Sequence, residues 1–212
     1  MKKITFLTIA FCCLVFSSYA QINKGTVFLG GSLGFAHQKT ETNGTESKQN
    51  VANILPAIGI AVRNNLVAGV QLAYSNNRLS DDVMGSEPYS RSYGGGVFVK
   101  KYRPLGRNFL LFGEASLDVR HIESQSYVNI DYSVDGKGWQ TSAGIHPGIA
   151  YSLSKHLQLE VALGDLVNIS YSHSNNNNIT IGGVTKTTQS NFSINTYFSS
   201  ATNIYLGFRV LL

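Results

Sequence analysis

Histidine is the side chain that most readily binds a metal or transfers a proton near neutral pH, and this chain has five. His37, His121, His146, His156 and His173 lie in different segments, whereas a metal site needs histidine, cysteine or carboxylate groups that converge. Of the five, His146 alone falls in a segment whose neighbours carry carboxylates on the same face. We therefore predict no metal site, and nothing in the sequence implies a cofactor.

The segment 171–175 is the best candidate for nucleophilic catalysis, because it places Ser172 beside His173. A hydrolase also needs a third group that orients the base, and serine and asparagine crowd this whole region. We therefore interpret the segment as the entry to a polar loop. The glycines at 94–96 are not followed by the helix and Lys-Ser/Thr pair of a phosphate-binding loop, so they indicate close packing. We predict no catalytic and no cofactor-binding residue.

A second set of chemically capable residues consists of isolated charges inside otherwise apolar segments. Three cations and three anions share one face of their segments, together with one histidine and two glutamines: Lys100, Arg120, Arg209, Glu114, Asp118, Glu160, His146, Gln71 and Gln158. Buried charges must be paired, because removing one member of a buried pair costs about 3–5 kcal/mol. A neutral total is what an enclosed network requires. The alternative is that Asp118 and Arg120 lie at a rim in water.

The elements that would position these residues are β-strands, because apolar residues alternate with small or polar ones. Beginning at Val27, the odd positions to Phe35 are apolar, apart from Gly31, and the even positions from Phe28 to Ala36 are mostly small. Eight segments show this alternation: 27–36, 54–62, 66–74, 93–100, 109–120, 139–151, 157–164 and 204–212. The chain is therefore predicted to be all-β and antiparallel.

Polar connections of two lengths separate the alternating segments. Three are short, at 63–65, 103–108 and 154–156, and the first contains Asn64 and Asn65, which tolerate the positive φ of hairpin turns. Four are long, at 37–50, 76–91, 123–137 and around Asn175–Asn178, and we predict them to be loops. Short turns at one end and long loops at the other are typical of transmembrane barrels, whose short turns face the periplasm.

An apolar strand face can be covered by a protein core or by a bilayer, and the opposite face discriminates between them. A soluble sandwich would present Lys, Glu and Thr to water, whereas the second face here is mainly Gly, Ala and Ser, which fits a narrow lumen. Aromatic residues of the apolar face lie at strand ends, where a membrane-interface belt would place them: Phe35, Tyr74, Tyr93, Trp139, Tyr151 and Phe109. Ordinary β-propensity explains only part of this placement.

The first twenty residues have the build of a secretory signal peptide. Lys2 and Lys3 precede an apolar run that is shorter than the ~20 residues of a membrane-spanning helix, and Ala20 ends a cleavage site that leaves Gln21 first. We predict a signal peptide over 1–20 and one barrel domain over 21–212. The cysteines, Cys12 and Cys13, lie in the apolar run without the flanking residues of a lipoprotein site, so the mature chain has no thiol.

Several stretches resemble the outer-membrane protein β-barrel domain family, the small barrels related to OmpA and OmpX. The resemblance is carried by residues 98–105 running into 111–115, by 146–151 and by 159–164, and it covers about residues 26 to 212. It implies an up-and-down barrel of about eight strands that is assembled into the outer membrane through recognition of its last strand. Leu212 departs from the aromatic residue with which that strand usually ends in the family.

Three function classes fit such a barrel. We expect a structural or surface-exposed protein without catalytic activity, in the outer membrane of a Gram-negative bacterium after export through the periplasm. The alternatives are a narrow pore, although aqueous porins use about 16–18 strands, and a lipid hydrolase or acyltransferase using Ser172 and His173. Expected partners are outer-membrane lipid, the barrel-assembly machinery and an unnamed extracellular ligand. The small, scattered net charge argues against nucleic acid, and we expect a monomer.

Overall fold

A computed structural model describes residues 21–42, 45–81, 88–106, 108–129, 132–180, 183–196 and 204–212. The signal-peptide prediction falls on residues 1–20, outside the described residues. The strands are β1 (Val27–Thr42), β2 (Thr45–Arg63), β3 (Leu66–Asp81), β4 (Tyr89–Gly106), β5 (Phe109–Asn129), β6 (Tyr132–Ser152), β7 (Leu157–Leu163), β8 (Val167–Thr180), β9 (Gly183–Thr196) and β10 (Ile204–Leu211). In these ranges no helix is long and apolar enough to span a membrane.

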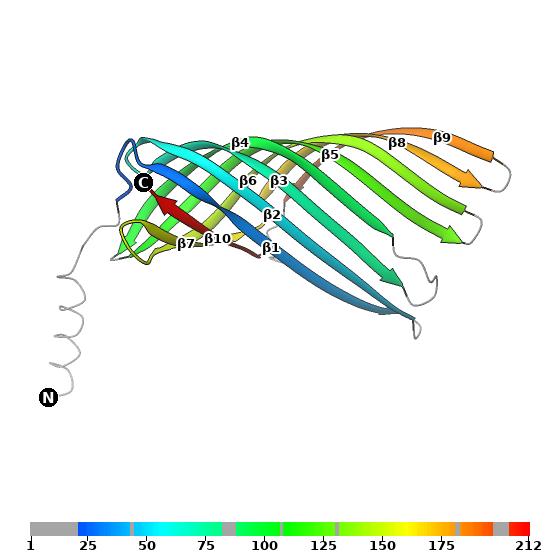
Figure 1. Cartoon of the computed structure of the whole chain (residues 1–212), viewed down its shortest axis with the longest axis horizontal. Helices are drawn as coiled ribbons and strands as arrows, with labels where there is room; N and C mark the ends of the chain where they lie inside the picture. The colour runs from blue at the N-terminus through cyan, green and yellow to red at the C-terminus, as the bar shows by residue number, and fades with distance from the viewer. Residues whose placement is uncertain are drawn as a thin grey trace, which may run out of the picture.

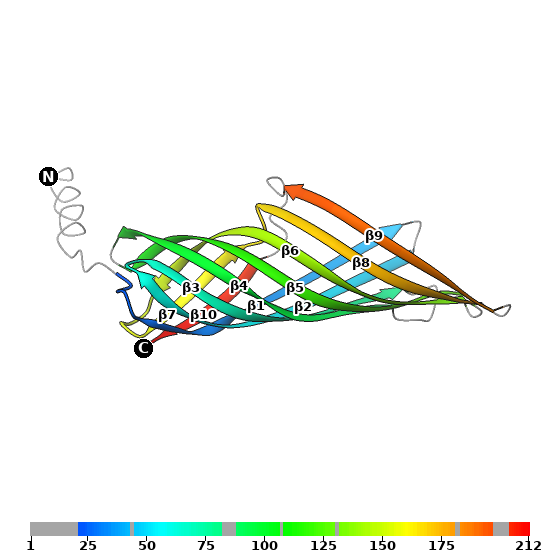
Figure 2. The same ribbon diagram turned by 90° about the horizontal axis from the view of Figure 1, so that it is seen from above.

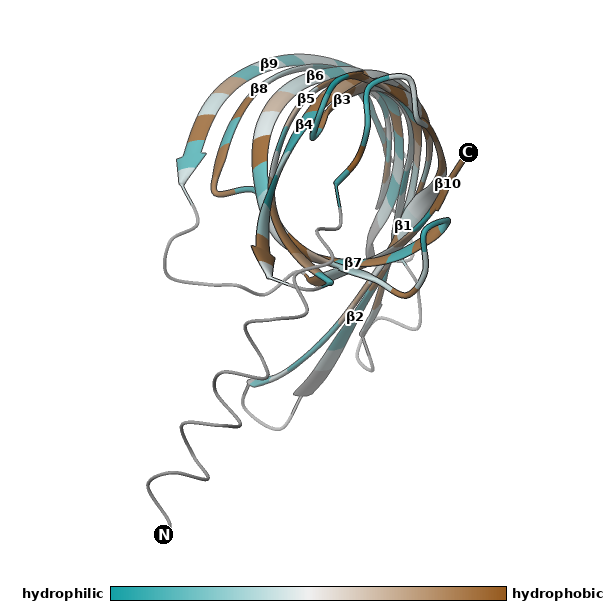
Figure 3. Cartoon of the chain, turned by 90° about the vertical axis from the view of Figure 1, so that its left-hand side faces the viewer, coloured by the Kyte–Doolittle hydropathy of each residue, from teal (hydrophilic) through white to brown (hydrophobic). Residues whose placement is uncertain are grey.

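The strands close into an antiparallel barrel (Figures 1 and 3). Each strand from β1 to β6 pairs with the next, and β10 pairs with both β7 and β1, so eight strands complete the ring among the described residues. The last backbone contacts are reciprocal hydrogen bonds between Val27 and Leu212, of 2.9 and 3.0 Å. The predicted all-β, up-and-down barrel is confirmed.

The β8–β9 hairpin continues the wall beyond this ring (Figure 2). Strand β6 pairs with β7 over residues 148–152 and with β8 over 132–145, so β7 and β8 are successive parts of one wall segment. The break between them contains Gly164, Asp165 and Leu166. The prediction of a loop around Asn175–Asn178 is therefore wrong, because these residues pair with both β6 and β9.

The other long polar stretches are also mostly strand rather than loop. Strands β1 and β2 pair as far as Thr42 and Thr45, β3 and β4 as far as Arg78 and Tyr89, and β5 and β6 as far as 129 and 132. The prediction failed because it followed the apolar face, whereas a hairpin ladder is held by backbone hydrogen bonds and continues where that face ends. The hairpins thus project well past the ends of β7 and β10 (Figure 1).

The predicted alternation of faces is confirmed along the ring. On β7, Val161 is 45% exposed on the outer surface, while its neighbour Glu160 is 4% exposed and points inward. Apolar and polar residues alternate along the strands (Figure 3), and apolar residues dominate the outside while the narrow lumen holds the isolated charges. The turn prediction is confirmed at Asn65, which has a φ of 59°.

An apolar cluster, here called the plug, fills the barrel at the short-turn end. Its members are buried residues from many strands: Ile22, Phe28, Ala61, Val67, Phe98, Tyr102, Leu110, Phe112, Ala150 and Leu211. Ile22 precedes β1 and is held there because its N–H donates to Asn65 Oδ1 at 3.0 Å, while the Asn65 N–H donates to the Ile22 carbonyl at 2.9 Å. Ile22 thus completes the core although it lies outside the strands.

Candidate functional site

The lumen holds the residues that could do chemistry, and its lower part, beside the plug, is a closed ion network. Lys100 Nζ lies 2.7 Å from Glu114 Oε2 and 2.9 Å from Glu160 Oε2. Arg209 Nη2 lies 3.3 Å from the same Glu160 oxygen, and the Tyr102 hydroxyl donates to Glu160 Oε1 at 2.6 Å. Two cations thus face two carboxylates, as predicted for an enclosed network.

Glu160 is the centre of this network. Removing a carboxylate from water costs several kcal/mol, which is offset only where hydrogen bonds and counter-charges are well placed. Glu160 has both, because two cations and one phenol converge on its two oxygens. Lys100 gains a further contact from the ring of Phe112, whose centroid lies 4.3 Å from Nζ. The network therefore joins β4, β5, β7 and β10 across the lumen.

Asp118 belongs to the lumen and not to the rim. It is 4% exposed and accepts a hydrogen bond of 2.9 Å from Gln71 Nε2. Gly96 pairs with Asp118 across the β4–β5 ladder, and a Cβ atom at Gly96 would clash with the Asp118 carboxylate. The glycines at 94–96 therefore provide close packing, as predicted. The rim alternative is wrong for Asp118, and Arg120 is half-buried and lines the lumen as well.

His146 lies in the upper lumen against Asp165, a residue that sequence reasoning missed. Asp165 Oδ1 is 3.0 Å from His146 Nε2, and Asp165 Oδ2 accepts a hydrogen bond of 2.6 Å from Asn168. The Oδ1 contact is close but not aligned as a hydrogen bond. Asp165 follows the last alternating apolar residue of β7, and that loss of alternation was the available signal. Gly144 leaves room for its carboxylate.

Ser116, His146 and Asp165 bring together the residue types of a hydrolase triad, but not its geometry. Ser116 Oγ is 3.3 Å from His146 Nε2, the same nitrogen that faces Asp165. A triad needs the carboxylate on one ring nitrogen and the serine on the other, so that the histidine can accept the serine proton. Flipping the His146 ring by 180° would not change this, because Ser116 and Asp165 would still face the same edge of the ring. The arrangement anchors His146 and does not activate Ser116.

The predicted nucleophile candidates are separated by the strand. Successive residues of β8 point to opposite faces of the sheet, so Ser172 lies on the inner face and His173 on the outer face. His173 Nδ1 instead contacts Ser190 Oγ on β9, at 2.9 Å, and its ring lies near Trp139. In the part of the chain that the structure describes, no third group hydrogen-bonds the other nitrogen of His173. The structure thus pairs His173 with a serine that the sequence did not indicate.

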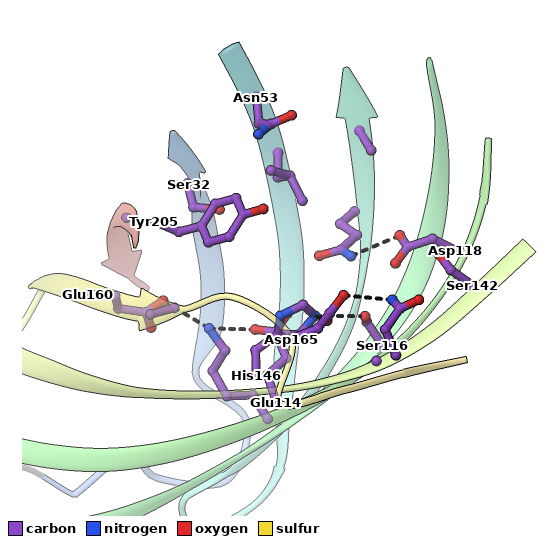
Figure 4. A pocket seen from close by; sticks show the side chains of 18 of the residues that line it. Ser32, Asn53, Glu114, Ser116, Asp118, Ser142, His146, Glu160, Asp165 and Tyr205 are labelled. Atoms are coloured by element: carbon purple, nitrogen blue, oxygen red, sulfur yellow. Dashed lines mark hydrogen bonds and ion pairs between the residues drawn. The ribbon is translucent and has the colours of Figure 1, made fainter. Parts of the chain in front are cut away.

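Above the ion network lies a cavity of about 190 Å³ (Figure 4). Its walls combine charges with hydroxyls and amides; they include Ser32, Asn53, Gln71, Ser116, Asp118, Arg120, Gln140, Ser142, His146, Asp165, Asn168 and Tyr205. Arg120 Nε is buried, and no acceptor among the described residues lies within hydrogen-bond distance of it. Over the same ranges, no three histidine, cysteine or acidic side chains converge as a metal would require.

The chain is similar to solved structures in fold and not to known proteins in sequence. No family model matches the chain, and no curated protein is similar in sequence. The solved structure of the outer membrane protein OprG from Pseudomonas aeruginosa matches with a TM-score of 0.54 and 11% identity, over 90% of this chain and 96% of that one. The fold is that of a small outer-membrane β-barrel. At this identity the likeness concerns fold and not activity.

Two further structures align over most of their length with lower scores. Neisserial surface protein A aligns at a TM-score of 0.42 and 14% identity, over 88% of this chain and 99% of that one. The translocator domain of the autotransporter NalP from Neisseria meningitidis aligns at 0.39 and 12% identity, over 100% of this chain and 93% of that one.

Proposed function

We propose that this chain is an integral outer-membrane protein of a Gram-negative bacterium, exported by a signal peptide cleaved after Ala20. The observation that carries this proposal is the apolar outer surface of the barrel. Large apolar side chains stand exposed on every strand of the ring, among them Val70, Val97, Leu117, Ile145 and Val161. A soluble monomer rarely exposes contiguous apolar patches beyond a few hundred Å². Lipid is the solvent that fits this surface.

We further propose that the barrel is closed to the passage of solutes. The plug fills the short-turn end with fully buried side chains such as Val67, Tyr102 and Leu110. A hollow at the short-turn mouth, lined by Gln21, Asn108 and His156 among others, shares no lining residue with the lumen cavity above the plug. Eight strands also leave an interior that side chains just fill. A structural or surface-exposed role fits better than a pore.

The projecting hairpins supply the surface for such a role. Beyond the apolar band, their exposed residues are mostly Thr, Asn, Ser and Lys, as on β9, where Thr185, Lys186 and Gln189 face solvent. We propose that these hairpins extend outside the cell and meet an extracellular partner. Outer-membrane lipid surrounds the barrel, the barrel-assembly machinery inserts it, and the mature protein is a monomer.

An enzyme acting on membrane lipid is the less favoured alternative, although His173 and Ser190 do meet on the outer face. Without an orienting partner the histidine is a weak base for serine. Mass spectrometry of lipid from cells expressing the protein would decide the matter. Acyl loss that disappears in a Ser190→Ala variant would establish the enzyme, and an unchanged lipid profile is the expected result.

The closed-barrel proposal is tested by conductance in planar bilayers. The protein refolded from Gln21 onward should migrate differently on a detergent gel before and after boiling, as a closed barrel does, and should carry no steady current. Replacing Tyr102 and Phe112 together by alanine should open the plug and create a current. A steady current through the unchanged protein would refute the closed barrel, and recovery from the periplasmic soluble fraction of cells would refute the membrane location.

A further inference from the structure

The lumen cavity has the features of a ligand site that the barrel itself does not require. A barrel gains stability from a packed interior, and the lower lumen is packed in this way by the plug and the ion network. The upper lumen instead keeps about 190 Å³ of space between charged walls. That volume has room for several water molecules, since a cavity needs only about 10–15 Å³ of probe-occupied volume to hold one. A ligand that fits must be small and strongly polar.

The positive wall of the cavity is Arg120 on β5. Lys100 and Arg209, the other cations of the lumen, are occupied by Glu114 and Glu160. Among the described residues Arg120 forms no ion pair, and its Nε is buried without an acceptor. A guanidinium presents several N–H groups in a fixed plane that suits a carboxylate. Arg120 is therefore the group to which an anionic end of a ligand would bind.

The negative wall is Asp165, at the break between β7 and β8. Its Oδ1 atom is buried, and the nearby His146 ring does not satisfy it with an aligned hydrogen bond. Asp165 and Tyr205, on β10, line the same cavity (Figure 4), and Arg120 lines it as well. Asp118 adds a second carboxylate on the Arg120 side, already held by Gln71. A cationic end of a ligand would bind at Asp165.

We propose that this cavity binds a small zwitterion, a molecule of amino-acid size that carries one carboxylate and one ammonium group. The carboxylate binds the Arg120 guanidinium, and the ammonium group binds Asp165. Hydroxyl and amide groups of Ser142 and Asn168 complete the polar wall. A lone anion would have two repulsive neighbours, Asp118 and Asp165, and a lone cation would have one, Arg120. The zwitterion satisfies both walls at once.

This proposal goes beyond the membrane role and does not rest on it. The cavity is built by the barrel wall, so it is present wherever the barrel is folded, including detergent micelles. Loss of the membrane location would leave the binding prediction intact, and loss of binding would leave the membrane location intact.

The test is a ligand-observed NMR titration of the refolded protein in micelles. The probes are alanine, acetate, ethylammonium and glycerol, which carry both charges, one charge of either sign, or none. Alanine should bind saturably and at least about tenfold more tightly than each of the other three. Equal binding of acetate would indicate a simple anion site, and equal binding of glycerol a site for neutral polyols. Either result, or no saturable alanine binding, would overturn the proposal.

Variants locate the site. Arg120→Gln and Asp165→Asn should each weaken alanine binding by about tenfold or more. The matched controls Arg103→Gln, at an exposed position, and Glu123→Gln, at a half-buried position outside the cavity lining, should leave it unchanged. Ser142→Leu, which fills the cavity without removing a charge, should abolish binding in a protein that still migrates as a folded barrel. Binding that survives Ser142→Leu would place the ligand elsewhere and contradict the proposal.

Discussion

The lower and upper parts of the lumen use similar residues and differ in how those residues are paired. Around Glu160, two cations and a phenol converge on one carboxylate that is almost fully buried. Around Asp165, one carboxylate has a single aligned donor, Asn168, and Arg120 has no counter-charge among the described residues. We infer that charges inside this barrel have two roles. A network in which every charge is paired holds strands together, whereas a network with unpaired charges can bind a ligand.

The largest loss of stability is expected for a substitution in the lower lumen. Glu160→Gln should lower the free energy of unfolding by about 3–5 kcal/mol, because Arg209 loses its counter-charge in a buried site. Lys100 keeps Glu114, so Arg209 is the cation whose neutralisation should restore stability. Urea unfolding of Glu160→Gln alone and combined with Arg209→Gln measures both. A Glu160→Gln variant as stable as the parent would contradict the structural role of the lower network.

The outer face of the same strand gives the next effect. Val161→Arg should destabilise the barrel in lipid vesicles by about 2–4 kcal/mol, because a cation would face the bilayer interior. Arg209→Gln should not rescue this variant, in contrast to Glu160→Gln. Tolerance of arginine at Val161, with disruption by a charge at Ala162, would reverse the assignment of inner and outer faces.

A smaller effect is expected at the turn that anchors the plug. Asn65 has a positive φ and accepts the hydrogen bond from Ile22 N–H. Asn65→Ala should lose both features and about 1–2 kcal/mol. Asn65→Gly should lose only the hydrogen bond, since glycine adopts positive φ freely, and should cost about 1 kcal/mol. Equal losses in urea unfolding would show that the backbone conformation is not the cause.

The smallest effect is expected in the upper lumen. Asp165→Asn should change the free energy of unfolding by less than about 1 kcal/mol, because its contact with His146 is partly exposed and not aligned as a hydrogen bond. The same urea titration used for Glu160→Gln measures it. A loss as large as that of Glu160→Gln would mean that both networks are structural, and the distinction drawn between them would fail.

The features that could be predicted from the sequence follow from the alternation of apolar and polar residues along the strands. Period-two patterning assigns a face to every residue of a strand, so the inward positions of Lys100, Glu114, Glu160 and Arg209 were predictable. Pairing was not, because it depends on register between strands distant in sequence. Gly207 of β10 lies opposite Glu160, which brings the next strand residue on that face, Arg209, to the same carboxylate.

Three features were not predicted, for other reasons. The polar hairpins are strands because the backbone ladder continues without an apolar face, and composition does not report this. Ile22 joins the plug through a tertiary contact with Asn65 that no local pattern encodes. Asp165 lies in the site because β6 changes its pairing partner from β7 to β8 at the break that contains Asp165. This change depends on the pairing of the whole sheet and not on the local sequence.

The central claim, a sealed lower lumen beneath an accessible upper one, is tested most directly by thiol labelling. A chain beginning at Gln21 has no cysteine, so single cysteines report without background. Ser142→Cys, in the cavity, should react with a small charged methanethiosulfonate in the folded barrel, whereas Ala61→Cys, in the plug, should react only after unfolding. Equal labelling rates at the two positions in the folded protein would contradict the account.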